Sequence, residues 1–183
     1  LVCRSEQELP KDEKNKIALF CSVPAKSVVS MHDVDTVYSI PILLNKQKVD
    51  DTILKKLNLK IKKPNLNDWK RVVKAKLLPE KEVNVSFVGK YTELKDSYKS
   101  INEALEHAGI QNKAKVNINF VEAEQITSKN VRKVLKKSDA ILVPGGFGER
   151  GIEGMILACE YARENDVPYL GICLGMQIAI IEY

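Results

Sequence analysis

A cysteine between two glycines is the feature of this sequence best suited to chemistry. Cys173 is the central residue of Gly171-Ile172-Cys173-Leu174-Gly175, the cysteine version of the G-x-S-x-G turn. In such a turn a strand passes sharply into a helix and holds the tip residue in a strained conformation, while the glycines let neighbouring backbone approach closely. The sulfur would sit at a helix N-terminus, where the dipole and free N–H groups favour a thiolate. We predict that Cys173 is a nucleophile for acyl transfer; the alternative is a buried, inert cysteine.

A second glycine-rich turn, Pro144-Gly145-Gly146-Phe147-Gly148, complements this nucleophile. Acyl transfer needs hydrogen-bond donors aimed at the developing oxyanion, and a turn rich in glycine presents bare N–H groups. We predict that the backbone N–H groups of Gly146 and Leu174 form this oxyanion hole. The alternatives are a plain tight turn or a phosphate-binding loop, but Glu149-Arg150 follows where a Walker-type loop needs Gly-Lys-Ser or Gly-Lys-Thr.

A cysteine nucleophile also needs a general base, and the sequence offers few candidates. The two histidines are His32, far upstream, and His107, near the end of a predicted helix. Neither is expected to be catalytic. We therefore expect the partners of Cys173 to lie beyond Tyr183.

Regular alternation of strands and helices positions these two motifs. The apolar periodicity predicts strands at 83–88, 116–121, 140–143 and 169–172. It predicts helices at 97–108, where Gly109 would end the helix, at 128–137, at 153–165 and from about 174 onward. Such alternation is typical of an α/β fold with an open, doubly wound, mostly parallel sheet. Ligands bind such sheets at the carboxyl ends of the strands, where both motifs lie.

The first third of the chain is less regular. Residues 17–23 form an apolar run that predicts a buried strand, and 40–44 and 53–57 predict short helical pieces. A lysine-rich, partly helical linker follows, with a helix that Asn67 would cap. We place domain boundaries at 1–60, a linker at 61–82, and the regular α/β domain at 83–183.

Composition excludes several classes of protein. The chain has 183 residues, is 44% hydrophobic and carries a net charge of +5, and it contains no apolar run long enough to span a membrane. The densest basic group has no interleaved aromatic residues, which argues against nucleic-acid binding; it consists of Lys55, Lys56, Lys60, Lys62 and Lys63. The four cysteines form no C-x-x-C pair, so we expect no metal site and a reducing, cytoplasmic environment.

The two motifs together resemble a known family. The Pro144–Gly148 turn, followed by Gly171 to Gln177, is similar to the class I (triad) glutamine amidotransferases. The resemblance implies that the cysteine attacks the side-chain amide of glutamine and releases ammonia. It also implies a histidine and a glutamate that complete the triad far downstream of the cysteine.

A longer resemblance, covering nearly the whole chain, is to the CTP synthase family. The segments that carry it are Val2 to Ser5, Lys16 to Cys21, Asp33 to Asp35, Val88 to Tyr91, Tyr98 to Ser100, Ala140 to Gly148, Arg150-Gly151, Glu153 to Met155 and Pro168 to Gln177. The resemblance implies a ligase of pyrimidine biosynthesis. With ATP and Mg²⁺ it phosphorylates UTP, and ammonia from glutamine then displaces the phosphate to give CTP. GTP activates the glutaminase, and the full-length enzyme is a homotetramer.

The family's motifs assign roles to matching positions in the glutaminase region. Cys173 matches the nucleophile. The glutamine-binding and oxyanion positions are Gly146, Leu174, Gly175, Met176 and Gln177. Lys99 and Arg150 match candidates for the response to GTP; the alternative for both is a solvated surface charge.

The upstream region, by the same resemblance, is the C-terminal end of the synthetase domain. Lys16 matches a lysine that binds UTP or the product CTP; the alternative is a surface lysine before a strand. His32, Asp33 and Val34 match the segment that contacts the adenine of ATP, largely through its backbone. The resemblance also implies that Arg4 binds near the adenine. The family often has lysine where this chain has His32, which is tolerable for a main-chain contact. The phosphate loop and the Mg²⁺-binding acids are expected upstream of Leu1, so no metal ligand is assigned here.

Two other readings stay open. The chain is part of another class I amidotransferase with a different acceptor, or a non-catalytic assembly or regulatory fragment. In either case, and as part of a CTP synthase, we expect the 183 residues alone to be inactive, since the triad histidine and glutamate are absent.

Overall fold

The computed structural model describes residues 1–60, 64–90 and 95–183, which form two compact units. The first unit spans Leu1–Leu78 and the second Pro79–Tyr183. Lys62 and Lys63 of the basic group, and Tyr91 of one segment named above, lie outside the described residues. No helix in the described ranges has the length and apolar character needed to cross a membrane.

The first unit is built on a parallel pair of strands. β1 (Val2–Ser5) and β2 (Val29–His32) pair in parallel, and α1 (Lys11–Phe20) connects them. Three further helices follow: α2 (Ile40–Lys46), α3 (Val49–Lys56) and α4 (Asn67–Leu77). Gln47 ties the end of α2 to β2, because its side chain accepts from the Ser30 N–H at 3.0 Å and donates to the Ser30 carbonyl at 2.8 Å. Short 3₁₀ turns lie at Ala25–Ser27 and Val37–Ser39.

The strand predicted at residues 17–23 is wrong. These residues end α1, and the chain then turns through Ser22 at a φ of 51°. Ala18 is buried, whereas Phe20 is 87% exposed. A short apolar run fits either a helix or a strand, and the residues before it decide the outcome: Pro10 precedes the first turn, which carries Asp12 and Glu13.

The second unit is a four-stranded parallel sheet in the order β4-β3-β5-β6. Its strands are β3 (Lys81–Gly89), β4 (Ala114–Glu122), β5 (Ala140–Val143) and β6 (Tyr169–Gly171). Its helices are α5 (Lys99–Gln111), α6 (Val131–Leu135), α7 (Ile152–Glu164) and α8 (Leu174–Glu182). Short 3₁₀ turns lie at Lys95–Tyr98 and Ala123–Gln125. The predicted α/β fold with a mostly parallel sheet is confirmed.

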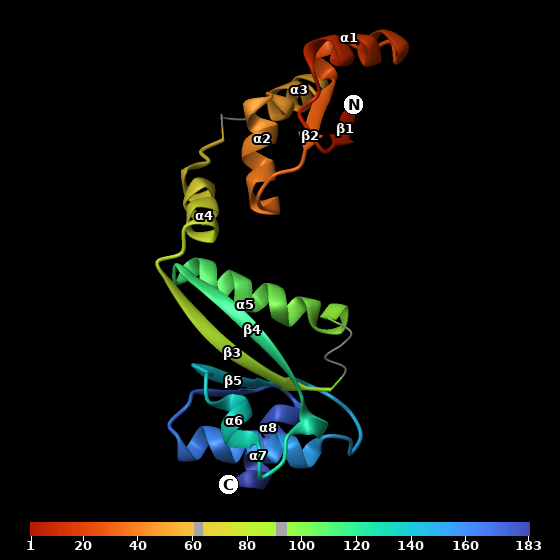
Figure 1. The fold of residues 1–183 in the computed structure, drawn as a ribbon. Helices are drawn as coiled ribbons and strands as arrows, with labels where there is room; N and C mark the ends of the chain where they lie inside the picture. The colour runs from red at the N-terminus through yellow and green to blue at the C-terminus, as the bar shows by residue number, and fades with distance from the viewer. Residues whose placement is uncertain (61–63, 91–94) are drawn as a thin grey trace. The chain divides into compact units, whose positions relative to one another are not determined.

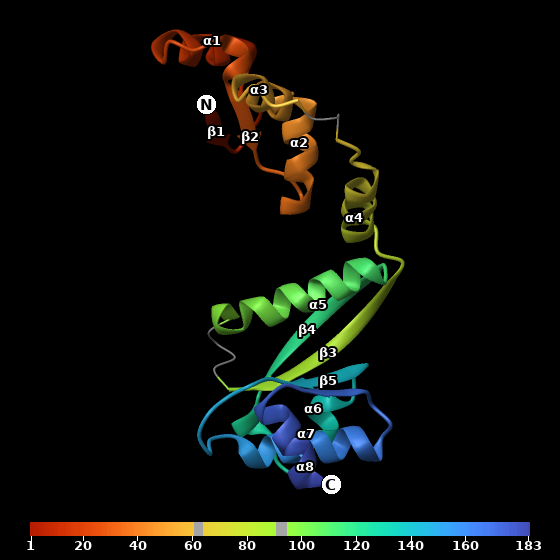
Figure 2. The ribbon, with the colours of Figure 1, turned by 180° about the vertical axis from the view of Figure 1, so that it is seen from behind.

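Side chains alternate between the two faces of this sheet. On β5, Ile141 and Val143 pack under α6, α7 and α8, while Leu142 faces the other side with Phe87 of β3. Among the described elements, α5 and Tyr98 just before it cover that second face (Figures 1 and 2). The strands are therefore apolar on both faces, as buried parallel strands are.

Gly109 does not end its helix, which corrects the predicted boundary at Ala108. α5 continues to Gln111, and Gly109 is buried within it. A β-carbon at Gly109 would lie 2.6 Å from the carbonyl oxygen of Ala114. The glycine thus lets α5 approach the start of β4.

The strand order has a topological switch point between β3 and β5. β3 and β5 are neighbours, but α5 leaves β3 on one face and α7 follows β5 on the other (Figure 1). Such a switch point is where open α/β sheets bind ligands. The Pro144–Gly148 turn follows β5 at this point.

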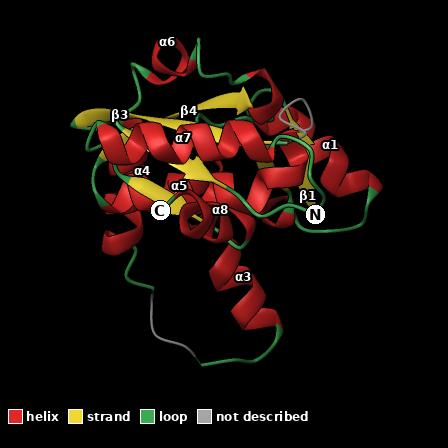
Figure 3. Cartoon of the chain, turned by 90° about the horizontal axis from the view of Figure 1, so that it is seen from below, coloured by secondary structure: helices red, strands yellow, loops and turns green. Residues whose placement is uncertain are grey.

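An ion pair fastens the far end of α8 to α7. The two helices pack against each other on one face of the sheet (Figure 3). Arg163 of α7 donates through Nε and Nη2 to Glu182 of α8, at 2.7 Å for the shortest contact. These hydrogen bonds hold the pKa of Glu182 below its ordinary value.

We predict that Gly175→Ala destabilises the second unit. A β-carbon there would lie 2.1 Å from the carbonyl oxygen of Val143, so α8 must move away from β5 at a cost of about 1–3 kcal/mol. Urea denaturation measures this change. Gly145→Ala is the matched control, because its β-carbon would meet nothing closer than 3.6 Å; equal stability of the two variants contradicts the prediction.

We predict that Glu182→Gln makes the folding stability less sensitive to a fall in pH. Because Arg163 lowers the pKa of Glu182 in the folded chain, the pair stabilises the fold above the ordinary carboxyl pKa, and this contribution is lost as pH falls through the lowered value. Melting temperatures between pH 7 and pH 3 should therefore fall less in Glu182→Gln than in the parent. Glu103→Gln, on an exposed part of α5, should keep the parent's dependence.

Candidate active site

Cys173 sits at the tip of a sharp turn between β6 and α8. Its φ is 53° and its ψ is −100°, and α8 begins at the next residue. A positive φ is rare for a residue with a side chain and marks strain that the surroundings must hold. The side chain is exposed. The strained elbow predicted from the glycine spacing is thus confirmed.

The two flanking glycines are required by close backbone contacts. A β-carbon at Gly171 would lie 2.4 Å from the carbonyl carbon of Gly175, and one at Gly175 would collide with Val143. The Ile172 N–H donates to the Val143 carbonyl at 2.9 Å, which aligns the elbow with β5. The strain at Cys173 is therefore held by packing on both sides.

Tyr169 adds a hydrogen bond beneath the elbow. Its hydroxyl donates to the Gly175 carbonyl at 2.8 Å. Burial, and then the nearby Cys159, raise the pKa of Tyr169 above its ordinary value. The hydroxyl therefore stays protonated and remains a donor to the first turn of α8.

The backbone donors of the elbow divide into two groups. The N–H groups of Gly175, Met176 and Gln177 donate to the carbonyls of Ile172 and Cys173. In the described part of the chain, no hydrogen bond occupies the N–H of Leu174 or of Gly146. These are the two groups predicted to form the oxyanion hole.

The Pro144–Gly148 turn lies against the elbow. A β-carbon at Gly145 would be 3.6 Å from that of Cys173, and one at Gly146 would be 3.3 Å from Cδ2 of Leu174. Of the predicted glutamine-binding residues, Met176 and Gln177 present exposed side chains beside the nucleophile. The structure thus brings together the predicted nucleophile and both predicted donors.

Lys90 is a residue at this site that sequence reasoning missed. It follows β3 and is only 2% exposed. Its ammonium donates to the carbonyls of Phe147 at 3.0 Å and Gly148 at 2.6 Å. Burial, and then the charge of Arg150, lower the pKa of Lys90. The signal available in the sequence was a lysine directly after an apolar strand, at the edge where the glycine-rich turn lies.

The two residues assigned to GTP differ in their surroundings. Arg150 pairs with Glu122 at 3.5 Å and with Glu124 at 3.2 Å, both near the carboxyl end of β4. Lys99 is exposed at the start of α5. No recorded interaction among the described residues joins the two.

In the first unit, three of the predicted nucleotide-binding residues gather at the carboxyl ends of β1 and β2. Arg4 donates to Asp33 and, at 2.6 Å, to the carbonyl of Ser5. Ser5 pairs in register with His32. The buried Nδ1 of His32 has no hydrogen-bond partner in the described ranges.

The other two predicted nucleotide-binding residues, Lys16 and Val34, make no side-chain hydrogen bond to this group within the described residues. Lys16 is exposed on α1, and no recorded interaction joins it to Arg4 or Asp33 within the described residues. Val34 follows Asp33 and is half-buried.

The remaining cysteines differ from Cys173. Cys159 is buried on α7, and burial raises the pKa of its thiol. Cys21 is exposed in the first unit, and Cys3 is partly buried. Across residues 1–60, 64–90 and 95–183, no group of His, Cys, Asp or Glu side chains is arranged to hold a metal ion.

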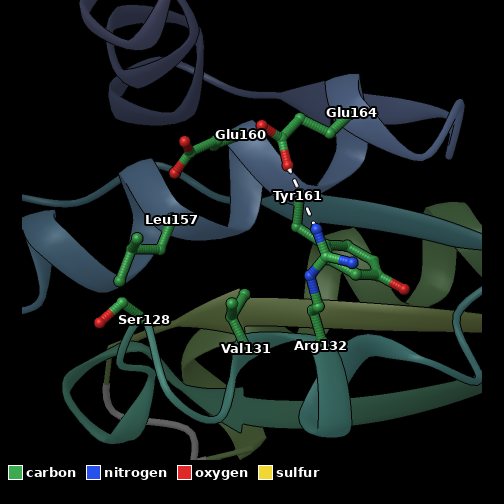
Figure 4. A pocket seen from close by; sticks show the side chains of 7 residues that line it. All are labelled: Ser128, Val131, Arg132, Leu157, Glu160, Tyr161 and Glu164. Atoms are coloured by element: carbon green, nitrogen blue, oxygen red, sulfur yellow. Dashed lines mark ion pairs between the residues drawn. The ribbon is translucent and has the colours of Figure 1, made fainter.

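A shallow pocket on the second unit lies apart from this chemistry. The residues labelled in Figure 4 come from α6, from α7 and from the segment just before α6. Arg132 and Glu164 pair across it at 3.8 Å. Glu160 and Tyr161 line the same hollow. We assign the candidate active site to the elbow instead, because the strained cysteine and the unoccupied donors converge there.

Known proteins resemble both units. Residues 1–59 match the family model described as the CTP synthase N-terminus, and residues 93–183 match that of class-I glutamine amidotransferase. A solved structure from Trypanosoma brucei, the CTPS glutaminase domain with bound acivicin, is 41% identical, with a TM-score of 0.52. The match covers 55% of this chain and 39% of that one, so this chain spans about two fifths of its relative. These matches, in this order along one polypeptide, show that the chain belongs to the CTP synthase family.

Proposed function

We propose that this chain is part of an enzyme that aminates UTP to CTP with ammonia taken from glutamine at Cys173. One observation carries the proposal: Cys173 stands at φ 53° on an elbow that faces the Gly145-Gly146 turn. A related domain was solved with acivicin bound, and acivicin is a glutamine analogue. Another class I amidotransferase would share the elbow, but the match of residues 1–59 favours CTP synthesis.

The chemistry at the elbow is acyl transfer. Attack by the Cys173 sulfur forms a C–S bond to the side-chain carbonyl carbon of glutamine, and charge develops on the oxygen. The N–H groups of Gly146 and Leu174 donate to that oxygen. Collapse breaks the C–N bond, and the nitrogen takes a proton and leaves as ammonia. Water then hydrolyses the thioester, which yields glutamate and frees the thiol.

The proton transfers require a base. Within the described part of the second unit, the histidine is His107 on α5, which covers the face of the sheet opposite α8. We propose that the histidine and glutamate of the family's triad take the role of the base. In this chain Gly175, Met176 and Gln177 would complete the glutamine site, the last two through exposed side chains.

The nucleotide side of the reaction would involve the first unit. We propose that Lys16 binds a phosphate of UTP or CTP as a point charge. His32, Asp33 and Val34 would contact the adenine of ATP, with Arg4 beside them. The unpaired Nδ1 of His32 and the parallel strand ends fit such a contact. ATP would bring Mg²⁺, whose acidic ligands we do not assign among these residues.

The remaining family properties are proposals of the same kind. Arg150 and Lys99 would take part in the response to GTP. Arg150 would leave its ion pairs with Glu122 and Glu124 and bind a phosphate of GTP instead. The complete enzyme would be a cytoplasmic homotetramer. We place the synthetase end at 1–60, the linker at 61–82 and the glutaminase part at 83–183.

The first test is selective labelling of Cys173. We expect acivicin to modify Cys173 about tenfold or more faster than Cys21, because the oxyanion donors assist only the reaction at the elbow. Peptide mass spectrometry of the 183-residue chain measures both sites. Iodoacetamide is the control and should alkylate both cysteines, since both are exposed. Equal rates of acivicin labelling at Cys173 and Cys21, or an unchanged total rate of labelling in Cys173→Ser, would sink the assignment.

The second test is the activity of the chain alone. We expect the 183 residues to release ammonia from glutamine about 10⁴-fold more slowly than a complete CTP synthase, since the described residues of the second unit place no histidine at Cys173. A coupled ammonia assay measures the rate, with Cys173→Ser as the blank. A rate comparable to that of the complete enzyme would mean that these residues already contain a base.

A further inference from the structure

Lys90 makes an unusual set of contacts for a lysine. It follows β3, and its ammonium donates to two successive carbonyls in the turn after β5, those of Phe147 and Gly148. Burying an ammonium is costly unless it is paired or hydrogen-bonded. The two carbonyls and the nearby charge of Glu124 offset that cost.

The backbone of Lys90 is itself anchored. The hydroxyl of Tyr98 donates to the Lys90 carbonyl. Tyr98 is buried, and its ring packs on Phe87 of β3 with the ring centroids 4.6 Å apart. The stem of Lys90 therefore starts from a fixed point in the core.

The turn that Lys90 contacts has little other support. Within the described residues, the two bonds from Lys90 are the hydrogen bonds recorded for residues 145–148. Phe147 is 95% exposed, and a β-carbon at Gly148 would meet nothing within 4 Å. Packing therefore does not hold the tip of the turn.

The same turn carries one of the two oxyanion donors. Gly146 directly precedes Phe147, and a β-carbon at Gly146 would lie 4.0 Å from Cδ of Lys90 and 3.3 Å from Leu174. The direction of the Gly146 N–H thus depends on how the Phe147 and Gly148 carbonyls are held. A donor helps only when it already points at the position that the oxyanion will occupy.

We infer that Lys90 is a positioning residue, which holds the Pro144–Gly148 turn so that the Gly146 N–H faces the Cys173 elbow. This inference rests on the proposed function, because it concerns the same oxyanion hole. Lys90 does not contact substrate in this role: its ammonium is buried and directed at the turn.

Lys90→Met tests the inference in the 183-residue chain. Methionine keeps most of the apolar stem and removes the ammonium. We expect the ratio of Cys173 to Cys21 labelling by acivicin to fall about tenfold or more, because a misdirected oxyanion donor is lost to the reaction. The iodoacetamide ratio should stay unchanged, since it requires only an exposed thiol. Lys90→Arg, which keeps a cation and donors, should recover part of the acivicin ratio.

Two controls separate positioning from unfolding. Lys113→Met removes an exposed lysine that pairs with Glu80 at 2.7 Å and should leave both ratios at parent values. Cys159 is buried, so its alkylation by iodoacetamide reports unfolding in any variant. Should Lys90→Met unmask Cys159, the milder Lys90→Gln takes its place.

The outcomes distinguish this inference from the function on which it rests. If the parent chain shows no preference of acivicin for Cys173, the proposed function fails. If the parent shows the preference and a folded Lys90→Met keeps it, Lys90 does not position the turn. If both reagents lose reactivity at Cys173 equally, Lys90 supports the elbow as a whole, and the inference is wrong.

Discussion

The close approach of α8 to β5 is the contact on which the rest of the site depends. Gly175 packs its backbone on the Val143 carbonyl, and Gly171 packs on Gly175. These contacts leave no room for a side chain at either glycine, and they force the chain to reverse at Cys173. The unusual φ of Cys173 is thus a result of packing between a strand and a helix. The exposure of the thiol follows from the same packing, because the elbow points away from the core.

The sheet brings residues that are far apart in the sequence together at the candidate site. β3, β5 and β6 are neighbours in space but are separated in sequence by helices on both faces. Their carboxyl ends therefore bring Lys90, the Pro144–Gly148 turn and Cys173 to one edge. The first unit uses the same principle on a smaller scale, since the parallel pair β1 and β2 brings Arg4 and His32 to neighbouring positions. In the second unit Lys90, the Pro144–Gly148 turn and Cys173 each come after the end of a strand, whereas Leu174 to Gln177 form the first turn of α8.

The parallel sheet and the strained turn at Cys173 could be predicted from the sequence, because each depends on local patterns, while the roles of Cys173 as nucleophile and of Gly146 and Leu174 as oxyanion donors stay predictions. Glycine spacing around Cys173 and strict alternation of strands and helices are visible without coordinates. Residues 17–23 misled because a short apolar run has no period of its own, and the first turn of α1 decided its structure. Gly109 misled because its role is tertiary: it accommodates Ala114, which only the packed sheet reveals. Lys90 escaped notice for the same reason, since its partners are far away in sequence.

The bond from Lys90 to Gly148 joins residues 58 positions apart. Such a contact depends on the pairing of β3 with β5, and parallel pairing across helical connections is a slow, non-local step in folding. An unfolded or partly folded chain would therefore carry Cys173 as an ordinary thiol, without its elbow or its directed donors. The strained, exposed Cys173 therefore exists only once β3, β5 and β6 have assembled.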